Sequence, residues 1–410
     1  MIQRVYRQIR DSGIADDGKV VITTSKSQIS AIRNQLGNDV EVCEEPCRRD
    51  TFPAIALATS FMHDILGIDS REVVIVCPVD AYVEDDYFKA FLGLSKILKD
   101  GKTSLALLGI NPTHPSSKYG YIIPKNKGMA VSEVKLFKEK PNEDTAEKYI
   151  NEQGALWNCG VFAFRLSYAL EKSEQLLGTK VYWDLLDGFN RLESKSFDYA
   201  VVEHETDISV LRFKGIWDDM GTWNAIAETL DTPVLGNGKI DSHCNDVNII
   251  NELDIPIVAL GISNTIICAS PGGVLVTQKD SSEYLKDVLD GEAEDIRFAD
   301  KSWGSFKVID ADDDSLTMKI SIAAHDHMHY HSHDNRDEVW VVTSGTGKII
   351  VNNDEQIIRP GDVVSMQAGV RHTVIAVSDL KMIEIQLGQD ISNADKRRYD
   401  WDDRWSISIK

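Results

Sequence analysis

The first half of the chain alternates short apolar runs with stretches of helical periodicity. The apolar runs, which have the length of buried strands, lie at 19–24, 73–77 and 104–109. Between the first two, apolar residues recur at helical spacing over 53–66, and Asp50 or Thr51 is positioned to cap that helix. Strands that alternate with helices predict an α/β domain, with a mainly parallel sheet covered on both faces.

The pattern changes in the second half. Short β-type pieces between about 247 and 279 are separated by Asn, Asp, Gly and Ser, which predicts a small β connector of β-helix type. A short helix is expected at 282–289, and from 301 to 388 only strand and turn signals recur, as in a small all-β barrel. The expected parts are 1–230, 236–290, 295–392 and a charged tail, 393–410.

Composition narrows the class of protein. A net charge of -21 over 410 residues argues against nucleic acid as a partner, but a bound divalent cation can still bring phosphates to carboxylates. No apolar run approaches the roughly 20 residues of a membrane span, and the N-terminus has no signal-peptide pattern. The 6 scattered cysteines fit a reducing compartment, so we expect a cytoplasmic protein without a membrane partner.

Histidines are concentrated in one short stretch of the second half. They stand at every second position: His325, His327, His329, His331 and His333. This spacing predicts that all of them lie on one face of a strand, for which a polar, solvent-facing strand is the simplest explanation. A carboxylate at Glu338 and a later imidazole at His372 suggest more, because three imidazoles and one carboxylate form a ligand set for a transition metal.

This order of residues resembles the cupin fold. The first cupin motif is complete from His331 to Gly345, whereas in the second motif Gln367 takes the place of the proline and Ala376 that of the asparagine. The resemblance implies an all-β barrel that binds Zn²⁺ or another transition metal. Its ligands would be His331, His333, Glu338 and His372. A barrel that serves only for packing remains the alternative.

Polar segments of the first half lie where ligands commonly bind. Asp80 follows the apolar run at 73–77, and the carboxyl end of a parallel strand is where open α/β sheets bind ligands. An aspartate at that position also commonly forms a turn. Arg49, Asp50 and Thr51 precede the helix at 53–66, where a helix N-terminus beside a cation suits phosphate or ribose, or simply a cap.

Taken in order, the segments of the first half resemble the motifs of one family. They are Glu45–Ile55, Pro78–Asp80, Tyr119–Ile122, Phe137–Pro141, Trp157–Phe162 and Trp217–Trp223. Together they are similar to the sugar-1-phosphate nucleotidylyltransferases, in particular the mannose-1-phosphate guanylyltransferases. The resemblance covers about residues 1–230, and Trp303–Phe306 is similar to the start of that family's C-terminal domain.

The resemblance implies an enzyme that makes GDP-mannose and pyrophosphate from GTP and mannose 1-phosphate. In the catalytic set, Asp80 and Asp219 would hold Mg²⁺ and Lys140 would contact the sugar phosphate. The implied substrate-binding residues are Glu139 and Asn158 at the sugar hydroxyls, Gly120 under the sugar, and Arg49, Asp50 and Thr51 near the nucleoside. We therefore expect GTP and a sugar 1-phosphate as partners, and the sequence leaves open whether the chain forms a homo-oligomer.

The chain departs from the family in two places. No G-x-G-x-R segment, which would wrap the triphosphate, occurs in the first 230 residues, so we expect the 410-residue chain alone to make no GDP-mannose. An upstream start or a chain kept for its cupin would each explain this.

The alternative function is a cupin-type mannose-6-phosphate isomerase, or a metal-dependent sugar-binding module, on an inactive scaffold. One residue inserted between His333 and Glu338 departs from the bifunctional enzymes, and a regulatory or oligomerising cupin is a third alternative.

Overall fold

The computed structural model describes residues 1–14, 19–37, 40–101, 103–285, 288, 297–388, 391 and 395–399. The chain divides into two compact units, Met1–Gly221 and Thr222–Lys410. Among the described residues, no helix is long and apolar enough to cross a membrane.

The first unit combines helices and strands. The helices are α1 (Ile2–Asp11), α2 (Lys26–Leu36), α3 (Thr51–Asp64), α4 (Asp85–Lys99), α5 (Glu143–Gln153), α6 (Leu166–Leu177), α7 (Tyr182–Gly188) and α8 (Phe197–Ala200), with 3-10 turns η1 (Phe189–Arg191) and η2 (Val202–His204). The strands are β1 (Val21–Ser25), β2 (Glu41–Glu45), β3 (Val73–Val76), β4 (Ala81–Val83), β5 (Leu105–Ile110), β6 (Tyr121–Pro124), β7 (Val131–Lys138), β8 (Leu156–Arg165), β9 (Ile208–Phe213) and β10 (Trp217–Asp219).

These strands confirm the predicted α/β class, and the large sheet is mixed: its β5–β9 pairing is parallel and its other pairings are antiparallel. The apolar runs expected as strands form β1, β3 and β5. A six-stranded sheet has the order β3-β8-β5-β9-β7-β6, in which β5 and β9 are parallel and β8 runs antiparallel between β3 and β5. Two smaller pairs, the parallel β1-β2 and the antiparallel β10-β4, complete the described strands of the unit.

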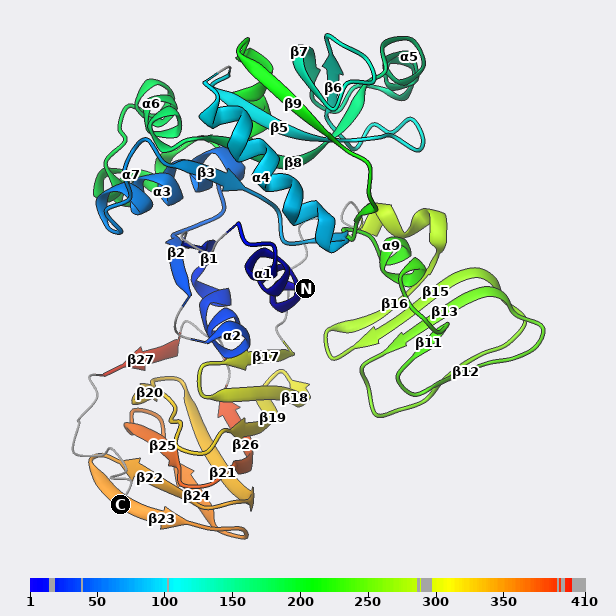
Figure 1. Ribbon diagram of the computed structural model, residues 1–410. Helices are drawn as coiled ribbons and strands as arrows, with labels where there is room; N and C mark the ends of the chain where they lie inside the picture. The colour runs from blue at the N-terminus through cyan, green and yellow to red at the C-terminus, as the bar shows by residue number, and fades with distance from the viewer. Residues whose placement is uncertain are drawn as a thin grey trace. The chain divides into compact units, whose positions relative to one another are not determined.

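Alternation along the strands gives this sheet a core on each face. Leu105 and Leu107 of β5 pack with Phe164 and with residues of α3 and α6, whereas Ala106 and Leu108 pack with α4 on the opposite face. Helix α4 crosses the sheet in Figure 1. Both faces are therefore covered, which leaves the strand ends and their loops to carry the polar groups of a site.

The helix expected over 53–66 is present as α3. It begins at Thr51 because the side chain of Asp50, the N-cap residue, accepts a hydrogen bond of 2.7 Å from the Thr51 backbone N–H. Asp50 has a φ of 64°, a backbone conformation that residues with a side chain adopt rarely. The first turn of α3 is thus fixed at the segment that was singled out for ligand binding.

The second unit begins with α9 (Trp223–Glu228) and a set of short strands. These are β11 (Val234–Leu235), β12 (Gly238–Ile240), β13 (Asn245–Asn251), β14 (Ile257–Ala259), β15 (Ser263–Ser270) and β16 (Gly273–Gln278), followed by the 3-10 helix η3 (Lys279–Tyr284). Strands β11, β13 and β15 pair in parallel, as do β12 and β14, so the chain alternates between two sheets as in the coils of a β-helix. The helix expected at 282–289 overlaps η3, and 286, 287 and 289 lie outside the described residues.

The remaining strands form two antiparallel sheets. They are β17 (Phe298–Lys301), β18 (Gly304–Asp312), β19 (Ser315–Ile322), β20 (His331–His333), β21 (Arg336–Ser344), β22 (Gly347–Val351), β23 (Asp354–Ile358), β24 (Val363–Met366), β25 (His372–Ala376), β26 (Leu380–Gly388) and β27 (Lys396–Arg398). The sheet orders are β17-β18-β19-β26-β21-β24 and β23-β22-β25-β20-β27. Trp340, Val374 and Met382 are fully buried in the core of this region, which confirms the expected all-β architecture.

The prediction that five histidines share one strand face is wrong. Only His331 and His333 lie in a strand, β20. His325 has a φ of 72°, which interrupts the extended backbone after β19, and His327 lies outside the named strands, in an isolated bridge with Ile375. His325, His327 and His329 are exposed, so they are separated from the buried pair that follows them.

Candidate functional site

Asp80 and Asp219 are brought together by a small antiparallel ribbon. Strands β4 and β10 pair so that Asp219 lies opposite Ala81, the residue after Asp80. The Met220 backbone N–H donates to the Asp80 carbonyl oxygen at 3.3 Å. The Asp219 carboxylate accepts a hydrogen bond of 2.9 Å from the Gly221 N–H, which fixes its orientation. The structure thus places these two expected metal ligands at neighbouring positions.

Aromatic rings link the pair Asp80 and Asp219 to the residues that are expected to bind the sugar. The Tyr119 ring lies 5.6 Å from the Trp217 ring and 4.7 Å from the Trp157 ring, centroid to centroid. Burial, together with the negative charge of Asp219, raises the pKa of Tyr119 to about 12. Trp157 is the residue before Asn158, and Tyr119 is the residue before Gly120. The pair Asp80 and Asp219 therefore lies along one side of the residues that are expected to bind the sugar.

Gly120, Glu139 and Asn158 form one cluster. The Asn158 backbone N–H donates to the Gly120 carbonyl oxygen at 2.8 Å. A Cβ added at Gly120 would lie 2.4 Å from Glu139 Oε2 and 3.3 Å from Asn158 Cβ, so only glycine leaves room for the Glu139 carboxylate. Lys140 adds a cation, with its Nζ 3.8 Å from Glu139 Oε1.

Glu139 is buried and incompletely hydrogen-bonded. Glu139 is 8% exposed, and its Oε2 atom has no hydrogen-bond partner among the described residues. Leaving such a group unpaired costs about 1–3 kcal/mol, so its persistence at a polar cluster is typical of a ligand site. Burial first, and then the charge of Asp198, raise the pKa of Glu139 to about 7, whereas Lys140 lowers it.

The segment Arg49–Thr51 contacts the loop that leads into α8. The Arg49 carbonyl oxygen accepts a hydrogen bond of 3.3 Å from the Lys195 N–H, and Thr51 Oγ1 accepts one of 2.8 Å from the Phe197 N–H. The Arg49 guanidinium donates to the Asn190 carbonyl oxygen. These contacts hold the segment beside Asp198, the residue that follows Phe197.

Asp198 also joins this cluster, and the sequence analysis did not name it. It accepts a hydrogen bond of 2.7 Å from Asn158 Nδ2, and burial raises its pKa to about 6. One signal in the sequence would have found it, because Asp198 is a charged residue inside the otherwise apolar and aromatic run Phe197–Val202.

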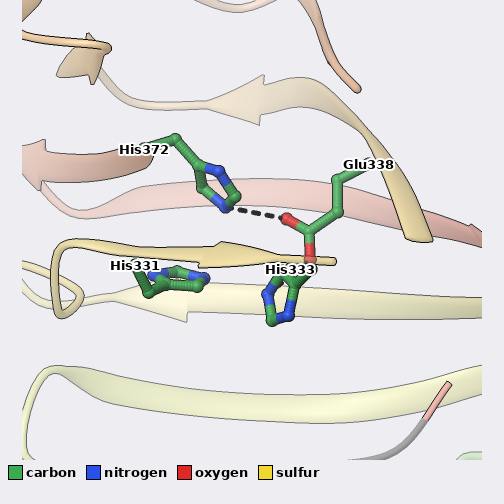
Figure 2. A group of neighbouring side chains, drawn as sticks. All are labelled: His331, His333, Glu338 and His372. Atoms are coloured by element: carbon green, nitrogen blue, oxygen red, sulfur yellow. Dashed lines mark ion pairs between the residues drawn. The ribbon is translucent and has the colours of Figure 1, made fainter. Parts of the chain in front are cut away.

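The second unit contains a buried cluster of three imidazoles and one carboxylate. One ligand atom each of His331, His333, Glu338 and His372 lies within 4.8 Å of the others, and each residue is 2% exposed. The cluster gathers residues from β20, β21 and β25 (Figure 2). His333 Nε2 lies 3.1 Å from Glu338 Oε1, and His372 Nε2 lies 3.1 Å from Glu338 Oε2.

Backbone carbonyls orient the three imidazoles. The Nδ1 atoms of His331, His333 and His372 lie 2.6, 3.1 and 3.0 Å from the carbonyl oxygens of His329, Asp395 and Val370. A carbonyl only accepts, so each Nδ1 carries a proton and donates it, which leaves Nε2 as the ring atom available to a metal. The Nε2 atoms of His333 and His372 then point to the two oxygens of the Glu338 carboxylate. Carbonyl-oriented imidazoles of this kind are typical metal ligands, so the donor set fits a transition metal.

The ionisation state also suits a metal. Although burial would raise the pKa of Glu338, its contacts with His333 and His372 hold that pKa well below its usual range. Burial lowers the pKa of His331 well below its ordinary value. A neutral imidazole and an ionised carboxylate are the forms that bind metals, so His331 and Glu338 need not lose a proton first.

Comparison with known proteins places the chain in a class. A family model described as nucleotidyl transferase matches residues 1–232, and one described as cupin domain matches residues 318–386. The chain therefore belongs to the nucleotidyl transferase family and carries a cupin domain after the transferase domain. This finding confirms the family and the fold classes that the motifs predicted, and it identifies the chain as an enzyme of the transferase class.

Its relatives carry a more specific name. A mannose-1-phosphate guanylyltransferase of Salmonella muenchen is 30% identical over 403 residues, which covers 90% of this chain and 83% of the relative. The enzyme of that name from Escherichia coli is 25% identical, covering 95% of this chain and 89% of the relative. A solved structure from Thermus thermophilus, described as a mannose-1-phosphate geranyltransferase, aligns with a TM-score of 0.55 at 27% identity, over 66% of this chain and 82% of that one.

Proposed function

We propose that the first unit is the catalytic domain of a mannose-1-phosphate guanylyltransferase, which transfers GMP from GTP to mannose 1-phosphate and releases pyrophosphate. The observation that carries this proposal is the cluster of Gly120, Glu139 and Asn158, with a buried carboxylate oxygen that lacks a partner among the described residues. A sugar hydroxyl is a donor of the right kind for that oxygen. The names of the relatives support guanine and mannose as the base and the sugar.

In this proposal the chain's own groups position two phosphorylated substrates. Glu139 and Asn158 bind sugar hydroxyls, and Lys140 pairs with the sugar phosphate, whose oxygen attacks the α-phosphorus of GTP. Asp80 and Asp219 would hold Mg²⁺, which neutralises phosphate charge and orients the reacting oxygens when it is bound. Asp50 and Thr51 border the cluster through Phe197, and we place the nucleoside on their side. GTP-dependent sugar activation is consistent with a cytoplasmic location.

For the cupin we propose a transition-metal site, with Zn²⁺ as the first candidate. Its ligands would be His331, His333, Glu338 and His372, because their Nε2 and carboxylate oxygen atoms converge. Isomerisation of mannose 6-phosphate to fructose 6-phosphate is a second candidate activity for this barrel. A coupled assay with and without Zn²⁺ separates it from a cupin that only binds, and the relatives' names favour the guanylyltransferase as the main function.

The proposal predicts that Gly120→Ala weakens mannose 1-phosphate binding by about 10-fold or more. The added Cβ would lie 2.4 Å from Glu139 Oε2, so the carboxylate must leave its position. Isothermal calorimetry with Mg²⁺ present measures the affinity. Gly188→Ala is the matched control, because Gly188 has a φ of -83° and its added Cβ would come no closer than 3.7 Å to Arg191. Equal affinity in wild type and Gly120→Ala would contradict the assignment.

Nucleotide transfer needs a separate assay, because no G-x-G-x-R segment occurs among the 410 residues. We expect the chain alone to bind mannose 1-phosphate but to release no pyrophosphate from GTP, because such a glycine-rich segment is what wraps the triphosphate. Pyrophosphate release would show that other residues replace the cradle. A chain that binds none of a panel of hexose 1-phosphates would refute the proposed function.

A further inference from the structure

Asp198 determines which way the amide of Asn158 points. Asn158 Nδ2 donates to Asp198 Oδ1 at 2.7 Å, and Asn158 Oδ1 accepts from the Gly160 N–H at 3.3 Å. The second of these is long, so the bond to the charged carboxylate is the stronger constraint. An amide has two N–H groups, and Asp198 takes one, which leaves the other to donate elsewhere.

The backbone around Asp198 is held on several sides. Phe197 packs against the rings of Phe52, Phe162 and Phe164, at centroid distances of 6.3, 4.8 and 5.7 Å. Its N–H donates to Thr51 Oγ1, and the Ser196 side chain caps α8 by accepting from the Tyr199 N–H at 3.2 Å. A carboxylate on such a fixed support can in turn orient a second side chain.

Asp198 also acts on Glu139 through charge. The negative charge of Asp198 is the largest cause, after burial, that raises the pKa of Glu139. The other charged groups that face the two carboxyl groups are Asp50 and Glu203, which are negative, and Lys140, which is positive. The cluster therefore presents an acceptor at Glu139 Oε2 beside a donor at Asn158, and a hydroxyl group can satisfy both because it donates and accepts.

We propose that Asp198 is a positioning residue of the sugar subsite, which holds the Asn158 carboxamide with one N–H free for a hydroxyl of a hexose 1-phosphate. The inference rests on the proposed function, since it deepens the assignment of the same cluster. Asp198 acts through Asn158, and its negative charge also raises the pH at which Glu139 becomes an ionised acceptor. Neither effect requires Asp198 to touch the sugar phosphate.

The test compares Asp198→Ala with Asp198→Asn by calorimetric titration of the full chain with mannose 1-phosphate. Asp198→Ala should weaken binding by about 10-fold, because the Asn158 amide loses its stronger constraint. Asp198→Asn should stay within about threefold of wild type, because an amide oxygen still accepts from Asn158. Asp187→Ala is the control, since Asp187 is exposed and makes only a 3.9 Å pair with Arg191.

A pH series gives a readout that a merely structural role would not move. In wild type the affinity should rise as Glu139 ionises near its pKa of about 7, and in Asp198→Asn this midpoint should move to lower pH, because a negative neighbour is removed. The inference is overturned if Asp198→Ala binds as wild type does, if Asp198→Asn is as weak as Asp198→Ala, or if the midpoint does not move.

Titration of wild type with the panel of hexose 1-phosphates distinguishes a failure of the role proposed for Asp198 from a failure of the proposed function. If wild type binds another hexose 1-phosphate instead of mannose 1-phosphate, the sugar of the proposed function is wrong, and the three variants are compared with that sugar. If wild type binds no hexose 1-phosphate, the proposed function and the role of Asp198 both fail.

Discussion

Replacing Glu338 by Ala is expected to remove the transition metal from the cupin. Glu338 contacts two of the three imidazoles, at 3.1 Å each, and supplies the negative charge of the ligand set. After loading with Zn²⁺ and dialysis, wild type should retain about one metal per chain and Glu338→Ala less than about a tenth of that. Elemental analysis of the dialysed protein measures the content.

Glu355→Ala is the matched control for this variant, because Glu355 lies on β23 of the same domain, at the surface, in an ion pair with Lys348. It should retain the metal. Zn²⁺ should also raise the unfolding temperature of wild type and of the control, but not that of Glu338→Ala, because a metal stabilises only the state that binds it. A wild type that retains no metal, or a Glu338→Ala variant that retains it fully, would contradict the site.

The cupin cluster shows what the sequence could predict. The pair His331 and His333 shares a strand face by spacing alone, and that part is local. The approach of His372 depends on the register of β20 with β25, in which His331 and His372 are directly paired. No local pattern sets a register between strands so far apart in the sequence, so residue types suggested the ligand set and the resemblance to cupins supported it, but neither could show that the four side chains meet.

Local patterns failed where backbone conformation or long-range packing decides. The left-handed φ of His325 broke the expected row of histidines, although the spacing of two continues through it. Asp198 was missed because its hydrogen bond with Asn158 forms only when α8 packs beside β8. Strands β4 and β10, which bring Asp80 and Asp219 together, have three residues each, too few to show a period.

Replacing Asp219 by Asn is expected to weaken cation binding at this ribbon by about 100-fold. Mg²⁺ and Mn²⁺ prefer anionic oxygen ligands, and the substitution leaves Asp80 as the only carboxylate of the pair. Mn²⁺ is the probe, because its electron paramagnetic resonance signal reports the free ion. The titration is made with mannose 1-phosphate present, since the sugar phosphate is expected to share the cation.

Asp218→Asn is the matched control, because Asp218 neighbours Asp219 on β10 but lies opposite Tyr82, and alternation along a strand directs its side chain to the other face. It removes the same charge from the chain, so a general loss of negative potential would weaken Mn²⁺ binding in both variants alike. Only a direct ligand role makes Asp219→Asn much the weaker of the two. Equal effects of the two substitutions would therefore argue against Asp219 as a metal ligand, even if both were large.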